Sequence, residues 1–214
     1  MIKVLYTHIS GQREESNLAS YLQKLPKALQ NKIAKYRRWQ DAYASLFGKL
    51  LLQAGLSVPG LEHYKLQDLK YSLHKRPYLE GNIDFNISHS GSYVVCVISD
   101  ECRAGIDIEE IKEINLEKFR RYWTLKEWEK ILHAPHQYDQ FYDYWTKKEA
   151  LVKAMGEGLY VPLRQIKLNN KFGLLWGKCW YFYALPIATG YCTHLAIDKE
   201  VNASIHIEEV VFPE

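Results

Sequence analysis

The chain has 214 residues, of which 47% are hydrophobic and 25% are charged, and its formal net charge is only +3. This length and apolar content allow one large domain or two small ones with real cores. The small net charge gives little support to a nucleic-acid-binding protein. No segment reaches the roughly 20 apolar residues of a membrane span, no signal-peptide-like run opens the chain, and the cysteines form no C-x-x-C pair. We therefore expect a soluble cytoplasmic protein.

The first half of the chain alternates between strand and helix patterns. In chain order, these predict a strand over 2–9, helical structure over 14–56 with a break near Pro26, extended structure over 65–80, and two strands within 82–99. Within the helical part, DAYASLFGKLLLQAGL (41–56) has helical apolar spacing and a plausible start at Asp41. The segment Ser-His-Ser-Gly, 88–91, is predicted as the bend between the two strands.

The segment GIDIEEI, residues 105–111, combines a strand pattern with acidic residues. Side chains alternate along a strand, so Asp107 and Glu109 share one face while Ile106 and Ile108 share the other. Carboxylates are depleted in strands, so the pair requires an explanation. Two acids on the exposed face of an edge strand would explain it, and a pair of metal ligands is the alternative.

The second half repeats the order of the first. Helical patterns cover 116–121 and 125–132, and a longer helix is predicted from Tyr138 to Met155, ending at Gly156 and Gly158. The remaining chain reads as extended. The repeated order predicts two related α+β halves, residues 1–104 and residues 105–214, with a ligand site in the cleft between them.

The segment WTKKEALVKAMG, residues 145–156, lies on that longer predicted helix. Glu149 and Lys153 are four residues apart on one helix face, which is the spacing of an ordinary ion pair. Combined with Asp107 and Glu109, however, Glu149 completes a set of three carboxylates that could hold one Mg²⁺ ion.

Basic side chains add a second part to this chemistry. Lys75, Arg76, His89 and Lys153 could bind phosphates. Carboxylates with a divalent ion, together with basic groups, suit metal-assisted chemistry on a polyphosphate ester.

Four short motifs occur in a recognisable order. They are Arg76-Pro77, Asn86-Ile-Ser-His89, Gly105-Ile-Asp-Ile-Glu109 and Trp145-Thr-Lys-Lys-Glu-Ala-Leu-Val-Lys153. In type, order and spacing they resemble those of the Sfp-type 4′-phosphopantetheinyl transferase family. The resemblance implies an α+β fold of two pseudo-symmetric α/β halves. Each half is a small antiparallel sheet packed on a long helix, with the active site between the halves.

The resemblance also implies a reaction. It is the transfer of 4′-phosphopantetheine from coenzyme A to a serine of an apo acyl or peptidyl carrier protein, with release of adenosine 3′,5′-bisphosphate. The enzyme implied is a Mg²⁺-dependent holo-[carrier protein] synthase for which Mn²⁺ can substitute. It would be a monomer that binds neither nucleic acid nor membrane.

By the same resemblance, the metal ligands are Asp107, Glu109 and Glu149. Glu149 is the candidate base, directly or through a metal-bound water, and Lys153 stabilises the charge that develops on the phosphates. The residues expected to bind coenzyme A are Lys32, Lys75, Arg76, Pro77, Asn86, Ser88, His89, Asp107 and Lys153. Glu127 is a further candidate near the site.

One position departs from the family pattern. A basic residue in the first-half helix usually contacts the 3′-phosphate of coenzyme A, and Ala44 occupies that position here. If Ala44 faces the bound coenzyme, the contact is missing unless Lys32, Lys35 or Arg38 supplies it.

Two other interpretations use the same residues. A Mg²⁺-dependent phosphodiesterase or nuclease would need the same carboxylates. A non-catalytic module that binds a carrier protein or a nucleic acid would need only the surface charges.

Overall fold

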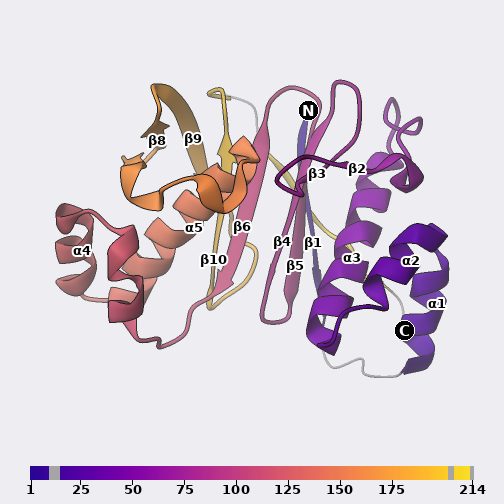
Figure 1. The fold of residues 1–214 in the computed structure, drawn as a ribbon, viewed down its shortest axis with the longest axis horizontal. Coiled ribbons are helices and arrows are strands. Elements are labelled where there is room, and N and C mark those ends of the chain that lie inside the picture. Colours follow the sequence, from indigo (N-terminus) through magenta and orange to yellow (C-terminus); the bar gives the residue numbers. More distant parts are fainter. Residues whose placement is uncertain (10–14, 202–204, 213–214) are drawn as a thin grey trace. The chain divides into compact units, whose positions relative to one another are not determined.

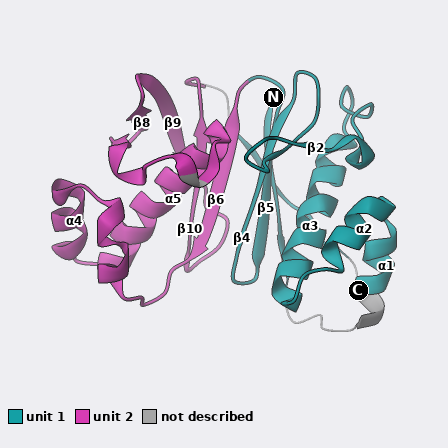
Figure 2. Cartoon of the chain, in the orientation of Figure 1, with its two compact units in different colours: residues 1–101, 204–214 teal, residues 102–203 magenta. Residues whose placement is uncertain are grey.

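The structure is a computed structural model that describes residues 1–9, 15–201 and 205–212. The chain forms two compact units, shown in Figure 2: unit 1 is Met1–Glu101 with Ser204–Glu214, and unit 2 is Cys102–Ala203. The predicted division at residue 104 had placed the whole C-terminal segment in the second half. In the structure this segment joins unit 1, because strand β11 (His206–Glu209) pairs in parallel with β1 (Ile2–His8).

Unit 1 is a four-stranded sheet with helices (Figure 1). The strand order is β11-β1-β5-β4, with β4 at Asp84–Ser90 and β5 at Tyr93–Ser99. Its other elements are α1 (Glu15–Gln23), α2 (Lys27–Ile33), α3 (Trp39–Leu56), a 3₁₀ turn at Leu66–Asp68, and the short pair β2 (Lys70–Tyr71) and β3 (Pro77–Tyr78). The apolar side of α3 packs on β5 and β1 to form the core of this unit.

The predicted break at Pro26 is confirmed, because Pro26 immediately precedes α2. Proline lacks a backbone N–H and fits only at the start of a helix. The long helix α3 begins at Trp39 rather than at Asp41. Asp41 lies in its first turn, where a carboxylate interacts favourably with the helix dipole.

The bend predicted over 88–91 is correct only at its last residue. Ser88 and His89 lie inside β4, where they pair with Val95 and Val94 of β5. The chain turns at Gly91, the last residue of the predicted segment, whose φ of 53° favours glycine.

Unit 2 is a five-stranded sheet with the order β6-β10-β9-β8-β7. The strands are β6 (Ala104–Glu110), β7 (Lys167–Leu168), β8 (Phe172–Leu175), β9 (Lys178–Ala184) and β10 (Tyr191–Ile197). The helices are α4 (Leu125–Leu132) and α5 (Gln137–Met155), with 3₁₀ turns at Leu116–Tyr122, Gly158–Tyr160 and Leu163–Gln165. Helix α5 packs across β6 and β10 and ends at Gly156, which has the left-handed conformation typical of a C-cap.

Each unit therefore combines a small sheet with one long helix, which confirms the α+β class. The sheets are antiparallel except for the β1–β11 pair. In the part of the chain that the structure describes, no helix combines the length and the apolar character needed to cross a bilayer.

Candidate active site

A close contact between a glycine and a helix organises the carboxylates of unit 2. A Cβ atom on Gly105 would lie 2.1 Å from the carbonyl oxygen of Ala150 and 2.3 Å from the backbone nitrogen of Ala154. Only glycine therefore lets α5 lie this close to β6. Asp107 and Glu109 follow at a spacing of two, so they lie on the face of β6 that α5 covers. The acidic face of this strand is not the solvent-exposed face of an ordinary edge strand.

Asp107 is held by a charged partner from α5. Its side chain is 4% exposed, and its Oδ1 lies 2.5 Å from Nζ of Lys153. A buried carboxylate requires such a partner, because its transfer out of water is costly. Lys153 therefore reaches across from the helix to the strand.

Glu149 lies on α5, one helical turn before Lys153. Burial, followed by the charge of Asp107, raises the pKa of Glu149 to about 7, with a smaller contribution from Glu109 and an opposing one from Lys153. Asp107 and Glu109 on β6 therefore lie near enough to Glu149 on α5 to influence its charge, and Lys153 of the same helix contacts Asp107 directly.

The donor set of this group suits a hard divalent cation, because carboxylate oxygens are the ligands that Mg²⁺ prefers. The side chains do not form a ready-made cage. Within residues 1–9, 15–201 and 205–212, no three His, Cys, Asp or Glu side chains are grouped closely enough to hold a metal ion. The Lys153 ammonium instead lies against Asp107. Binding a cation would require Lys153 to move from Asp107 and the carboxylates to converge.

Glu127 has a structural partner. It forms a capping box with Thr124 at the start of α4, and its Oε2 lies 2.9 Å from Nζ of Lys148. Lys148 is fully buried, and its ammonium also lies 4.7 Å from the ring centre of Trp123. These contacts explain Glu127 as an anchor between α4 and α5 and do not require a catalytic role.

Lys148→Met is expected to destabilise the protein by about 3–5 kcal/mol, because it leaves the buried Glu127 carboxylate without its cation. Urea denaturation measures the loss. Lys112→Met removes the partner of Glu110 in an exposed pair and should cost about 0–1 kcal/mol. Equal losses in the two variants would refute the structural role of the buried pair.

The predicted phosphate-binding residues of unit 1 lie on β3, β4 and the turn before them. The guanidinium of Arg76 pairs with Asp84 at 2.9 Å, a partner that the sequence gave no reason to expect. Lys75 is exposed and has a φ of 62°, which is rare for a residue with a side chain. Pro77 opens β3.

The Asn-Ile-Ser-His motif lies along β4. Asn86 and Ser88 are buried, whereas His89 is exposed. Lys32 of α2 places its ammonium 3.9 Å from the ring centre of Tyr71.

Ala44 does not lie on the surface of unit 1. It is 4% exposed and belongs to the hydrophobic core of unit 1. The expectation that Ala44 leaves a gap in a phosphate site is therefore wrong, because this side of α3 packs against the core.

Ala44→Arg is consequently expected to destabilise unit 1 by about 3 kcal/mol or more, since a guanidinium would be forced into packed apolar surroundings. Thermal unfolding measures this loss, and Ala28→Arg on the exposed side of α2 is the control that should change little. A stable Ala44→Arg protein with tighter coenzyme A binding would contradict the buried position.

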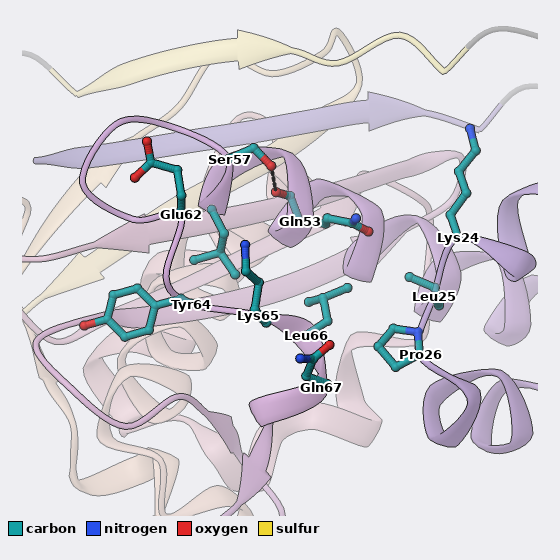
Figure 3. A pocket seen from close by; sticks show the side chains of 11 residues that line it. Lys24, Leu25, Pro26, Gln53, Ser57, Glu62, Tyr64, Lys65, Leu66 and Gln67 are labelled. Carbon is teal, nitrogen blue, oxygen red and sulfur yellow. Dashed lines mark hydrogen bonds between the residues drawn. The ribbon is translucent and has the colours of Figure 1, made fainter.

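Unit 1 also has a pocket of about 470 Å³ that the sequence did not indicate. Figure 3 shows its lining, which includes Gln53 and Ser57 near the end of α3, with Tyr64 and Lys65 from the following loop. None of the predicted coenzyme A residues lines this pocket.

Comparisons with known proteins identify the family of this chain. A family model described as the 4′-phosphopantetheinyl transferase superfamily matches residues 103–180, and one described as 4′-phosphopantetheinyl transferase, N-terminal, matches residues 12–101. The 4′-phosphopantetheinyl transferase gsp of Aneurinibacillus migulanus is 31% identical over 79% of this chain and 72% of its own length. The chain belongs to the 4′-phosphopantetheinyl transferase superfamily. Within this superfamily, the transferase Sfp of Bacillus subtilis is 34% identical over 62% of this chain and 60% of its own length.

The chain also matches a relative from a mammal. The L-aminoadipate-semialdehyde dehydrogenase-phosphopantetheinyl transferase of Mus musculus is 31% identical over 64% of this chain and 50% of its own length. The chain thus spans between half and about three quarters of the lengths of these three relatives. The motifs at Gly105–Glu109 and Trp145–Lys153 lie within the first of the two family matches.

Proposed function

We propose that this chain transfers 4′-phosphopantetheine from coenzyme A to a serine of an apo acyl or peptidyl carrier protein and releases adenosine 3′,5′-bisphosphate. Membership of the superfamily supports the reaction class. The observation that carries the proposal is the group of Asp107, Glu149 and Lys153 held between β6 and α5, with Glu109 next to it.

In this reaction the serine oxygen forms a bond to the β-phosphorus of coenzyme A, and the bond from that phosphorus to the bridging oxygen breaks. We assign the serine proton to Glu149, which lies beside the charged groups of the site. Lys153 would stabilise negative charge on the phosphates. Asp107, Glu109 and Glu149 would hold Mg²⁺, or Mn²⁺ in its place, and the bound ion would supply charge neutralisation for the pyrophosphate.

The remaining coenzyme A contacts are proposed from unit 1. They are Lys32, Lys75, Arg76, Pro77, Asn86, Ser88 and His89. The exposed imidazole of His89 and the exposed ammonium of Lys75 are accessible to a phosphate, whereas the Arg76 guanidinium is also bound to Asp84. We further propose that the protein acts as a cytoplasmic monomer without a nucleic-acid or membrane partner.

His89→Ala is expected to weaken coenzyme A binding about tenfold, because it removes a charged or polar donor to a phosphate. Titration calorimetry with coenzyme A gives the affinity. His206→Ala removes another exposed histidine of unit 1 and should leave the affinity unchanged. Equal affinity of His89→Ala and the wild type would exclude His89 from the binding site.

The experiment that tests the reaction follows the nucleotide product. The protein is incubated with coenzyme A and Mg²⁺, with and without an apo carrier domain, and adenosine 3′,5′-bisphosphate is measured by chromatography. Its release only when the carrier is present supports transfer. Release at the same rate without a carrier would identify a phosphodiesterase. No release with any apo carrier would contradict the proposed transferase activity.

A further inference from the structure

A polar contact joins α5 to β10 at the level of the candidate active site. Oγ1 of Thr146 lies 2.7 Å from Nδ1 of His194 and 2.7 Å from the backbone carbonyl oxygen of Tyr142. One assignment satisfies both contacts: the ring donates its Nδ1 proton to Thr146, and the hydroxyl donates to the carbonyl. Thr146 is fully buried and His194 is 3% exposed, so water does not compete for this bond. The contact therefore links the helix directly to the sheet.

His194 lies beside Asp107. The two residues are direct partners across the antiparallel pair β6–β10. Side chains of such partners project from the same face of the sheet with Cβ atoms about 4.5–5.5 Å apart. Burial lowers the pKa of His194 to about 4, so its ring is neutral near pH 7 and adds no charge next to Asp107.

The catalytic candidates on α5 lie on the same face of the helix as Thr146. Thr146, Glu149 and Lys153 are spaced by three and four residues, so they lie along one face of the helix. Thr146 is bonded to His194, and Lys153 is bonded to Asp107. Glu149 lies between these two contacts along the helix.

A charged pair supports the other side of the imidazole. Lys147 binds both carboxylate oxygens of Asp143 at 2.7 Å, and Asp143 Oδ1 lies 3.5 Å from Nε2 of His194. At 3.5 Å this last contact is too long for a good hydrogen bond. The bond to Thr146 is therefore the one that fixes the ring against the helix.

We propose that His194 is a positioning residue: through Thr146 it fixes the position of α5 over β6, and thereby the distance between the carboxylates of Glu149 and Asp107. The part of this inference that concerns catalysis rests on the proposed function. The part that concerns the helix does not, because it follows from contacts within unit 2 alone.

The test compares four variants. His194→Leu and Thr146→Val each remove the contact, the second without a change of side-chain shape. His194→Asn keeps a polar group near the position of Nδ1. Thr193→Val is the matched control, because Thr193 is equally buried on β10, faces the other side of the sheet, and its hydroxyl has no hydrogen-bond partner among the described residues.

Three measurements are made on each variant. Amide hydrogen exchange over residues 146–153 reports the helix, Mn²⁺ binding measured by electron paramagnetic resonance reports the carboxylates, and steady-state kinetics report catalysis. His194→Leu and Thr146→Val should each speed the exchange about tenfold and weaken Mn²⁺ binding and kcat by similar factors, with KM for coenzyme A little changed. His194→Asn should recover most of each loss, and Thr193→Val should match the wild type.

Unchanged exchange and Mn²⁺ binding in Thr146→Val would overturn the proposal, and this variant decides the matter even if His194→Leu fails to fold. Losses of the same size in Thr193→Val, or no recovery in His194→Asn, would also overturn it. A failure of the proposed function can be distinguished from a failure of this inference. In that case the wild type makes no product with any carrier, while the exchange rates still separate Thr146→Val from Thr193→Val.

Discussion

Asp107→Asn should lower kcat/KM for transfer by a factor on the order of 10³ or more while the protein stays folded. The substitution keeps the shape of the side chain and removes the charge that binds Lys153 and that we assign to the metal. The folded state loses this ion pair, but it also loses repulsion, because Asp107 raises the pKa of Glu149. These two effects on stability oppose each other. We therefore expect the substitution to lower activity and to change the stability little.

Steady-state kinetics and urea denaturation measure the two quantities for Asp107→Asn. Glu110→Gln is the control, since it removes a carboxylate from the same strand on the opposite face, where Glu110 pairs with the exposed Lys112. More than about a tenth of wild-type activity in Asp107→Asn would remove this carboxylate from the proposed mechanism. Full activity of that variant in excess EDTA would remove the metal as well.

Gly105→Ala should cost about 3 kcal/mol or more of stability, and the folded fraction should lose most of its activity. The added Cβ would meet the backbone of α5 at 2.1 Å and 2.3 Å, and a helix backbone cannot move aside locally. The helix must shift as a whole, which separates Glu149 and Lys153 from Asp107.

Gly173→Ala on β8 provides a graded comparison in the same sheet. There the added Cβ would meet side-chain atoms of Phe182 and Leu151, at 2.8 Å and 3.0 Å, and side chains can adjust. Its loss should be smaller, and activity should persist. Thermal unfolding and kinetics of both variants give the comparison. A Gly105→Ala protein as stable and as active as Gly173→Ala would show that the close approach of α5 to β6 is not essential.

Local patterns predicted the acidic strand and the long helix correctly. The alternation in GIDIEEI placed Asp107 and Glu109 on one face, because strand geometry alone decides this. The spacing of Glu149 and Lys153 placed them on one side of α5 in the same way. Which face is covered depends on the approach of α5 at Gly105, which is a tertiary contact and leaves no periodic pattern in the sequence.

The larger differences from the expectations concern the tertiary packing of the chain. The C-terminal strand β11 pairs with β1, and no local signal specifies a partner so far away in the chain. Ala44 was assigned by its place in a motif, whereas its neighbours Tyr43 and Phe47 are core residues and the helix buries Ala44 with them. The partners Asp84 for Arg76 and Lys148 for Glu127 were likewise missed, because ion pairs outside helical spacing depend on the fold.

The proposed role of the charged group on β6 and α5 is the transfer of phosphopantetheine to a carrier serine. Its most direct test is the intact mass of an apo carrier domain after incubation with coenzyme A, Mg²⁺ and either the wild-type protein or Asp107→Asn. We expect that the wild type adds the mass of one phosphopantetheine group, that a carrier lacking the acceptor serine gains nothing, and that Asp107→Asn leaves the carrier unmodified over the same time. An unmodified carrier with the wild type across acyl and peptidyl carriers, or equal modification by Asp107→Asn, would contradict it.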